Sequence, residues 1–214
     1  MTETIRITEI FYSLQGETTL VGLPTVFVRL TGCPLRCQYC DTAYAFKGGE
    51  LKSIDSILSE VASYSPLYVT VTGGEPLAQK NCLTLLHHFC EQKYVVSLET
   101  SGAMDVAQVD NRVIKILDIK TPASKESHRN MLSNFSHLQP KDQVKFVICD
   151  RDDYEWSKAF VDQYSLKEQC EVLFSPSHQQ LAARELADWI VADRLPVRFQ
   201  MQLHKALWND EPGR

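Results

Sequence analysis

The sequence of 214 residues has no long apolar run, no block of like charge and no internal repeat. Because a membrane-spanning helix needs about 20 consecutive apolar residues, we expect no membrane attachment. Basic residues are also fewer than acidic ones: the sequence has 22 Lys and Arg and 27 Asp and Glu, which gives a net charge of −5. A general nucleic-acid binder has a basic excess instead, so we expect no nucleic-acid partner.

A secretory signal is lacking as well, because Met1 to Glu9 is polar and has no apolar stretch after a basic start. We therefore expect a cytoplasmic protein whose seven cysteines stay reduced. Clustered cysteines in a reducing compartment indicate metal binding or catalysis rather than disulfides. Four cysteines are scattered in apolar segments and are expected to be small core residues: Cys82, Cys90, Cys149 and Cys170.

The other three cysteines, Cys33, Cys37 and Cys40, lie in the run T-G-C-P-L-R-C-Q-Y-C-D-T. Three thiolates on one loop match three corners of a [4Fe–4S] cluster, which normally takes four cysteines. The missing fourth ligand would leave one iron open to bind a small molecule. A structural zinc site is the alternative, and it needs a fourth ligand such as a histidine. No histidine lies at close spacing to these cysteines, so the pattern favours the cluster over zinc.

Apolar strand-like runs alternate with helix-like stretches along the chain. This alternation is typical of a parallel sheet with right-handed crossovers, and about six βα units of this kind would curve into an incomplete barrel. We therefore predict an α/β fold, a partial parallel β/α barrel, in a single domain over residues 1–214. The expected strands are Ile5–Phe11, Thr25–Leu30, Leu67–Thr72, Tyr94–Glu99, Val113–Ile119, Gln143–Cys149, Glu171–Phe174 and Val197–Gln202.

Helices are expected over Ser53–Tyr64, which has apolar residues on one face, and over Asn81–Glu91. Two further helices are predicted from capping boxes, in which two side chains three positions apart satisfy free backbone N–H groups. The boxes are Asp152 with Glu155, and Ser177 with Gln180 before a helix over Leu181–Val191 that ends by Pro196.

Charged side chains stand where three of the strands end, and active sites of parallel α/β folds form at these carboxyl ends. In T-G-G-E-P, the glycines at 73–74 let a ligand approach the backbone, and Glu75 offers a carboxylate to an ammonium group. Glu99 needs a ligand or a cation if it is buried. Asp118 and Lys120 share a strand face and either pair with each other or bind a ligand.

Arg29 lies within the apolar run F-V-R-L and therefore needs an anion nearby. A substrate carboxylate would serve, and so would Glu9 or Glu17. The segment F-Y-S-L-Q-G-E at 11–17 is expected to leave the first strand and enter a loop.

Together, C-x-x-x-C-x-x-C and the later G-G-E-P resemble the pattern of radical S-adenosylmethionine (SAM) enzymes. The S-L-Q-G-E start, the C-D-T end of the cysteine loop, E-T-S-G and Q-L-H-K resemble one family among them, the 7-carboxy-7-deazaguanine synthases. This resemblance extends from Ile7 to about Trp208. It implies a partial barrel of the radical SAM type.

The resemblance also implies chemistry, cofactors and partners. In this family SAM at the open iron is cleaved reductively, and the resulting 5′-deoxyadenosyl radical abstracts hydrogen from 6-carboxy-5,6,7,8-tetrahydropterin. The ring contracts, ammonia leaves, and 7-carboxy-7-deazaguanine forms on the route to queuosine, while SAM is regenerated. The expected cofactors are a [4Fe–4S] cluster, SAM and Mg²⁺. The expected partners are the pterin, an electron donor such as a flavodoxin, and a second copy of the chain in a homodimer.

Residue roles follow from the same resemblance. The catalytic cluster ligands correspond to Cys33, Cys37 and Cys40. The contacts to SAM correspond to Tyr39, Cys40, Asp41, Gly74, Glu75, Asp118, Lys120 and Ser175. The substrate pocket corresponds to Leu14, Gln15, Gly16, Arg29, Thr72, Glu99 and His204, with Glu99 reading the amino-pyrimidine edge. Thr42 corresponds to the Mg²⁺ ligand, as a hard oxygen donor.

The chain departs from the family pattern in places. Asp118 stands where many members have the Ser of S-P-K, and S-P-S-H from Ser175 replaces Q-P-x-x. Shorter relatives use their terminal carboxylate on the substrate, and Asn209 or Asp210 would take its place here. Two alternatives are kept. A glycyl-radical activase would need a groove for a partner peptide, and a non-catalytic iron–sulfur or zinc module would leave the charged strand ends without a role.

Overall fold

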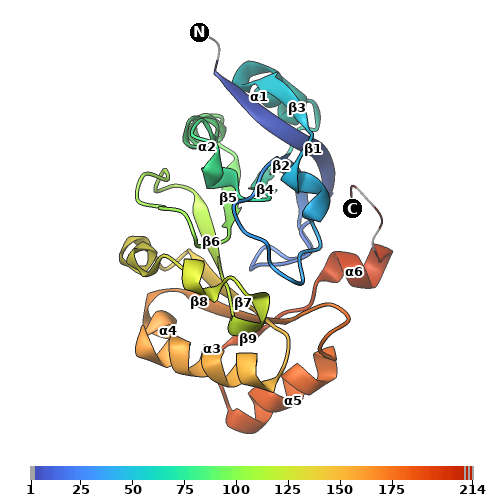
Figure 1. Cartoon of the computed structure of the whole chain (residues 1–214). Helices are drawn as coiled ribbons and strands as arrows, with labels where there is room; N and C mark the ends of the chain where they lie inside the picture. The colour runs from blue at the N-terminus through green and yellow to red at the C-terminus, as the bar shows by residue number, and fades with distance from the viewer. Residues whose placement is uncertain (1–2, 210, 212, 214) are drawn as a thin grey trace.

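The computed structural model describes residues 3–209, 211 and 213, which form one curved sheet with helices on its outer side (Figure 1). The strands are β1 (Thr4–Leu14), β2 (Pro24–Leu30), β3 (Glu50–Ser53), β4 (Tyr68–Gly73), β5 (Val95–Thr100), β6 (Ile114–Ile119), β7 (Gln143–Ile148), β8 (Glu171–Pro176) and β9 (Arg198–Phe199). Their order in the sheet is β3-β1-β2-β4-β5-β6-β7-β8-β9. Neighbours from β2 to β9 are parallel, whereas β1 is antiparallel to both β2 and β3.

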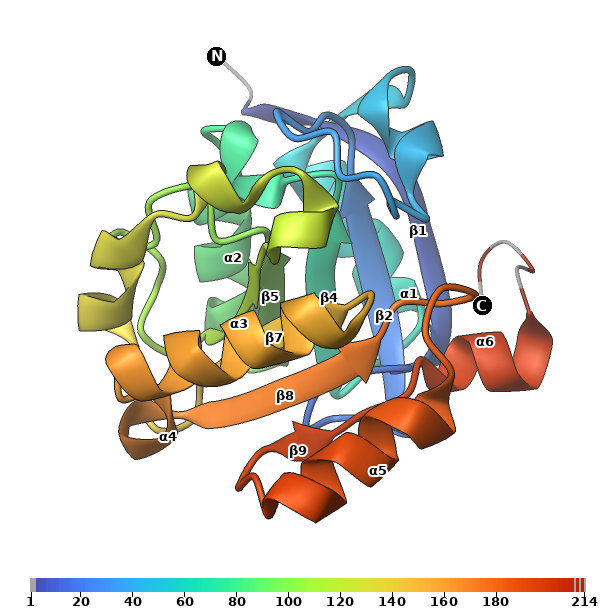
Figure 2. The same cartoon turned by 60° about the horizontal axis from the view of Figure 1, so that its bottom comes forward.

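Helices connect most of the parallel strands and cover the convex face of the sheet; α3 and α5 flank β8 and β9 in Figure 2. The α-helices are α1 (Ile54–Ser63), α2 (Cys82–Glu91), α3 (Arg151–Gln163), α4 (Leu166–Gln169), α5 (Ala183–Asp193) and α6 (Leu203–Trp208). Short 3-10 helices are η1 (Ala43–Phe46), η2 (Pro76–Ala78), η3 (Pro122–Ser124), η4 (Ser127–Arg129) and η5 (Leu132–His137).

Apolar and polar side chains of the strands lie on opposite faces of the sheet, because successive residues of a strand face opposite sides. On β4, Val69 and Val71 belong to the apolar core that packs against the helices, while the alternating residues Thr70 and Thr72 are buried on the other face. The same alternation places Ser97 on the inner side of β5. Burial of the outer apolar face is the main favourable term for folding, and the inner face is left polar.

The open edges of the curved sheet are joined by the loop between β1 and β2 and by α6. The N–H of Thr18 in this loop donates to Gln200 Oε1 just after β9, at 2.9 Å. The N–H of Leu203, the first residue of α6, donates to the carbonyl of Gly16 at 2.9 Å. Both views accordingly place α6 beside β1 (Figures 1 and 2). The incomplete barrel is thus closed by hydrogen bonds of loops rather than by strand pairing.

The predicted partial β/α barrel is confirmed, and every expected strand is present. The exception to the parallel arrangement is β1. A parallel partner needs a crossover of a dozen or more residues, and the connection from β1 to β2 is too short for one. The edge strand β3 and the helices α4 and α6 are additions that the sequence analysis did not foresee.

Both predicted capping boxes are wrong in position. The helix α3 is capped by Asp150, whose carboxylate accepts from the N–H of Asp153 at 2.8 Å, so it begins earlier than Asp152. The helix α5 begins at Ala183, and its N-cap Ala182 provides no side-chain bond. Ser177 instead lies where β8 gives way to a turn, and the Gln180 N–H donates to its carbonyl at 3.1 Å.

The four scattered cysteines, Cys82, Cys90, Cys149 and Cys170, are all buried free thiols, as expected of core residues. Within the described residues, no helix combines the length and the apolar character that crossing a membrane requires.

Replacing the observed cap should weaken α3 measurably. Asp150→Ala removes the acceptor for the Asp153 N–H, and we expect the free energy of unfolding to fall by about 1 kcal/mol. Asp152→Ala, one position into the helix, removes only a favourable charge near the helix N-terminus and should cost less. Urea unfolding of both variants measures the difference. Equal losses would contradict the assignment of the cap to Asp150.

Candidate functional site

The cysteine loop begins directly after β2 ends at Leu30, at the carboxyl end of the parallel strands. Gly32, with φ at +99°, lets the chain turn there. Its N–H donates to the Ala45 carbonyl at 2.8 Å, and its carbonyl accepts from the N–H of Glu75 at 2.8 Å. The loop is thereby fixed to η1 on one side and to the end of β4 on the other.

The glycine pair at the end of β4, Gly73 and Gly74, is packed against β2 and this loop. A Cβ at Gly74 would lie 2.4 Å from the Gly32 carbonyl oxygen and 2.8 Å from the Cβ of Cys33. At Gly73, which has φ of +154°, a Cβ would lie 2.3 Å from the carbonyl oxygen of Leu30. The sequence predicts that these glycines let a ligand approach the backbone. In the structure, the cysteine loop itself approaches Gly74, and the end of β2 approaches Gly73.

Cys33, Cys37 and Cys40 are free thiols and are partly exposed. Burial raises the pKa of each thiol, that of Cys37 to about 11, and the positive charge of Lys120 opposes this shift. Thiolates at these positions therefore need a cation, and iron is one that such soft ligands bind. In the described part of the chain, no three His, Cys, Asp or Glu side chains are placed to hold a single metal ion. Three cysteines on one short loop are a donor set that fits a cluster.

Four charged side chains form a line across the inner face, and we call them the buried charge chain: Glu17, Lys145, Asp118 and Lys120. Lys145 Nζ lies 2.6 Å from Glu17 Oε2 and 3.5 Å from Asp118 Oδ2, and Lys120 Nζ lies 3.0 Å from Asp118 Oδ1. Burial alone would raise the pKa of Asp118, but the two lysines outweigh it and hold this pKa below its usual value. Asp118 and Lys120 therefore pair, which was one of the two alternatives left open by the sequence.

Tyr39, between Cys37 and Cys40 in the cysteine loop, contacts the buried charge chain through Lys120. The Nζ of Lys120 is 5.9 Å from the centroid of its ring, within cation–π range. The Tyr39 hydroxyl is buried and has no hydrogen-bond partner among the described residues. Burial raises the pKa of this hydroxyl, so it stays protonated and can donate to a bound molecule.

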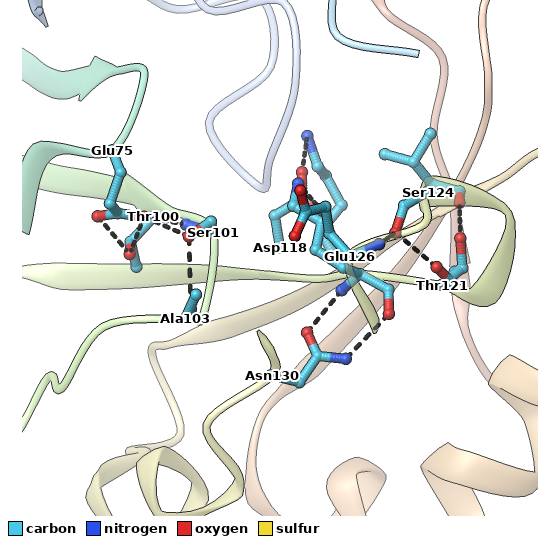
Figure 3. A network of polar contacts seen from close by, with 12 residues as sticks. Glu75, Thr100, Ser101, Ala103, Asp118, Thr121, Ser124, Glu126 and Asn130 are labelled. Atoms are coloured by element: carbon cyan, nitrogen blue, oxygen red, sulfur yellow. Dashed lines mark hydrogen bonds and ion pairs between the residues drawn. The ribbon is translucent and has the colours of Figure 1, made fainter. Parts of the chain in front are cut away.

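The carboxylate of Glu75 is fully buried and is held by residues at the end of β5 (Figure 3). Thr100 Oγ1 donates at 2.9 Å, the N–H of Ser101 at 2.7 Å, and the N–H of Leu77 at 3.0 Å. Ser101 Oγ donates to the same carboxylate. Both oxygens are thus in use within the protein, and the assignment of Glu75 to an ammonium group stays a prediction.

The backbone of Lys120 is fixed by a residue that the sequence analysis did not identify. Asn130 accepts from the N–H of Lys120 at 2.9 Å and donates to its carbonyl at 2.9 Å (Figure 3). These paired bonds hold the end of β6 where Lys120 faces inward. No pattern in the sequence marks Asn130, because the contact depends on the fold of the η3–η4 segment.

Glu99 lies on the inner face of β5, next to the loop after β1. Its carboxylate accepts from Gln15 Nε2 at 3.2 Å and from Thr72 Oγ1 at 3.3 Å. Burial raises the pKa of Glu99, while the charge of Lys145 opposes the shift. The structure therefore brings together three of the residues expected in the substrate pocket, from the loop after β1, from β4 and from β5.

Arg29 has a carboxylate partner within the protein. Its Nε donates to Glu9 Oε1 at 2.7 Å, and the hydroxyl of Tyr44 donates to the same oxygen at 2.8 Å. Of the two acids considered from the sequence, Glu9 is the partner and Glu17 is not. The Nη atoms of Arg29 have no bond to a described residue that would compete with a ligand.

At the end of the cysteine loop, Thr42 Oγ1 donates to Asp41 Oδ1 at 2.8 Å. The other oxygen of Asp41 accepts from Gln202 Nε2 at 3.4 Å, a weak bond from the segment that leads into α6. The chain after β9 thus reaches the residues that follow Cys40. The Thr42 hydroxyl and the Asp41 carboxylate, two groups whose oxygens can ligate a metal ion, are therefore adjacent here.

The remaining predicted residues lie along the closure of the barrel and on β8. The ring of His204 on α6 packs so closely on Gly16 that a Cβ there would lie 2.1 Å from Nδ1, and burial lowers the pKa of His204. Leu14 ends β1, and Ser175 is buried on β8. Asn209 is exposed after α6, while Asp210 lies outside the described residues.

Sequence reasoning missed Glu17 and Lys145 as members of the site. Lys145 carries the signal that identified Asp118 and Lys120, a charge at an alternate position of an apolar strand. Glu17 carries no such signal, since its partner lies 128 residues away along the chain.

The chain is similar in sequence to known proteins. The model of the Radical SAM superfamily matches residues 27–119. Two proteins named 7-carboxy-7-deazaguanine synthase, from Chlorobaculum tepidum and Koribacter versatilis, are each 42% identical to this chain. Each alignment covers 97% of this chain, and 96% and 98% of the respective relatives.

Solved structures show the same fold at lower identity. QueE from Escherichia coli superposes with a TM-score of 0.78 at 20% identity, over 94% of this chain and 95% of that one. SuiB from Streptococcus suis, solved with a precursor peptide, gives a TM-score of 0.60 at 16% identity and covers 82% of this chain but 48% of its own. The partial barrel is therefore shared well beyond the range of close sequence similarity.

The packing of Gly74 against the cysteine loop predicts a specific defect. In Gly74→Ala the new methyl group would clash with Gly32 and Cys33, so the loop must shift and anaerobic reconstitution should leave most of the iron unbound. Gly48→Ala is the control, because Gly48 has positive φ but open space around it, and this variant should load iron normally. Iron and sulfide analysis measures both. Normal loading of Gly74→Ala would show that the loop tolerates the displacement.

Proposed function

The chain belongs to the radical SAM superfamily and, within it, to the 7-carboxy-7-deazaguanine synthases, and from this premise we propose its reaction and the roles of its residues. The enzyme converts 6-carboxy-5,6,7,8-tetrahydropterin to 7-carboxy-7-deazaguanine with loss of ammonia. The observation that carries this conclusion is the 42% identity to two such synthases over nearly the full length of all three chains.

The cysteine loop is the place for the cluster. A [4Fe–4S] cluster and SAM are the cofactors of the superfamily, and when bound they supply the reductive cleavage that starts the radical reaction. Cys33, Cys37 and Cys40 would hold the cluster through thiolates. The close packing of Gly74 under Cys33 supports this role, because it fixes the loop to the sheet.

SAM would be held beside this loop. The buried hydroxyl of Tyr39, which lacks a partner in the described structure, is a donor for it. Lys120 offers a cation to the carboxylate of the methionine part, with Asp118 to hold the lysine in place. We assign Asp41, Gly74, Glu75 and Ser175 to the same cofactor as further contacts.

The substrate would lie on the inner face, where Glu99 meets Gln15 and Thr72. Glu99 can accept two N–H groups from the amino-pyrimidine edge, since charge-assisted bonds of this kind are strong. Arg29 has Nη atoms to offer to the substrate carboxylate, with Glu9 fixing its Nε. Leu14, Gly16 and His204 would complete the pocket from the side of α6.

Thr42 is proposed as the protein ligand of Mg²⁺. Its hydroxyl is a hard donor, and Mg²⁺ typically keeps several waters and takes few protein ligands. The ion would bring the substrate carboxylate to the end of the cysteine loop. The adjacent carboxylate of Asp41, which accepts from the Thr42 hydroxyl, supports a cation at this place.

Five further proposals concern the enzyme as a whole. Residues 1–214 act as one radical SAM core domain, and the enzyme works in the cytoplasm as a homodimer. A flavodoxin supplies the electron. The product feeds queuosine synthesis.

The direct test of the function is anaerobic turnover. Reconstituted enzyme with SAM, Mg²⁺, a reductant and 6-carboxytetrahydropterin should form 7-carboxy-7-deazaguanine and ammonia in equal amounts, read by mass and absorbance. Cys37→Ala should lose both the cluster and turnover. Cys90→Ala changes a buried core thiol away from the loop and should keep both. A wild-type enzyme that loads its cluster but leaves the pterin unchanged would refute the proposed function.

The magnesium assignment has its own test. Thr42→Val removes the hydroxyl at nearly constant shape, so the cluster content and the binding of SAM should stay normal. Turnover should fall about tenfold or more, as expected when an interaction of ~1.4 kcal/mol is lost from the transition state, and its dependence on Mg²⁺ should flatten. Titration of the rate with Mg²⁺ measures the effect. A wild-type Mg²⁺ response in Thr42→Val would show that the ion is held elsewhere.

A further inference from the structure

Glu17 has one carboxylate oxygen that the protein leaves without a donor. Its side chain is 9% exposed. Oε2 is bound by Lys145 at 2.6 Å, but Oε1 is buried and has no hydrogen-bond partner among the described residues. Buried polar atoms are almost always satisfied by protein, water or ligand. A carboxylate oxygen accepts only, so Oε1 has room for an N–H or O–H group that the described residues do not supply, such as that of a bound ligand.

The surrounding structure holds Glu17 in this position. Its own N–H donates to Gln15 Oε1 at 3.2 Å. The two residues after it are tied to the sheet, Thr18 to Gln200 at 2.9 Å and Thr19 to Gln143 at 2.7 Å. The carboxylate therefore stays on the inner face rather than turning to solvent.

Glu17 also lies in the same electrostatic environment as the proposed substrate contacts. Burial is the largest influence on both neighbours: it raises the pKa of Glu99, to which the negative charge of Glu17 adds, and it lowers the pKa of His204, which the charge of Glu17 opposes. Gln15 links the two acids directly, accepting from the Glu17 N–H and donating to Glu99. Lys145 balances the charge by binding both Glu17 and Asp118.

We propose that Glu17 is a substrate-binding residue whose Oε1 accepts an N–H of the reduced ring of the tetrahydropterin. The inference rests on the proposed function, in which Glu99 already takes the amino-pyrimidine edge. The donors that remain are chiefly the two N–H groups of the reduced ring. In the oxidised pterin these nitrogens carry no hydrogen and would face a carboxylate as acceptors. Glu17 therefore selects the reduced substrate over its oxidised form.

The test compares the binding of two ligands, 6-carboxytetrahydropterin and fully oxidised 6-carboxypterin. Cluster-loaded enzyme with SAM is titrated without reductant, so that no turnover occurs. Wild type should bind the reduced compound at least about tenfold more tightly, as expected for one charge-assisted bond. In Glu17→Gln the amide can donate as well as accept, so this preference should shrink to about threefold or less, with weaker binding of the reduced compound.

Two further variants separate this effect from structural damage. Glu17→Gln combined with Lys145→Gln leaves neither charge unpaired and should lose the preference in the same way. Asp142→Asn weakens another buried ion pair, the one with Lys115 at 2.8 Å outside the site. It should lower the melting temperature without changing the preference.

The outcomes distinguish the inference from the function on which it rests. If wild type turns the pterin over and Glu17→Gln keeps the full preference for the reduced ring, Glu17 only neutralises Lys145 and the inference is wrong. If wild type neither binds nor converts the pterin, the proposed function itself fails.

Discussion

The interior of the barrel carries charge, and the need to neutralise that charge governs how the chain closes. Lys145 and Lys120 point to the inner face from β7 and β6, where an unpaired cation would be costly. Asp118 lies between them, and Glu17 completes the balance from the loop after β1. That loop can reach Lys145 only because it folds back across the sheet, held by Gln200 and Gln143. The same loop therefore closes the open edges of the sheet and neutralises the buried charge.

The buried ion pairs connect two parts of the inner face that are proposed to have different roles in the reaction. The buried charge chain extends from Lys120, near Tyr39 and the cysteine loop, to Glu17, near Gln15 and Glu99. Residues proposed for the cofactor and residues proposed for the substrate thus meet in a single network of ion pairs and hydrogen bonds. Such networks are rigid when every member has a partner. Glu17 Oε1, a buried oxygen without a hydrogen-bond partner among the described residues, lies at the end of the buried charge chain that is near Gln15 and Glu99.

The sequence predicted the parallel strands well because their outer faces are runs of β-branched and other apolar residues, such as Val69 and Val71. It failed for β3, since E-L-K-S has no apolar alternation and forms a strand only through its pairing with β1. Short motifs identified the cysteine loop and Glu99. The true cap of α3 was missed because Asp150, Asp152 and Asp153 stand close together, and only backbone conformation selects among them. Contacts between distant segments, such as Glu17 with Lys145, depend on the closed fold and leave no local signal.

The two ends of the site are also linked through the backbone, and Glu75 makes that link. Its N–H holds the carbonyl of Gly32 at the base of the cysteine loop. Its carboxylate holds Thr100 and Ser101 at the end of β5, directly after Glu99. If the cysteine loop moved, Glu75 would therefore transmit the movement to Glu99. Hydrogen abstraction requires the reacting atoms to lie in near contact, and an error of about 1 Å is enough to cost much of the rate. The buried, fully bonded carboxylate of Glu75 contributes to such an alignment whether or not it also touches the cofactor, because it fixes the spacing between the cysteine loop, proposed to hold the cluster, and Glu99, proposed to bind the substrate.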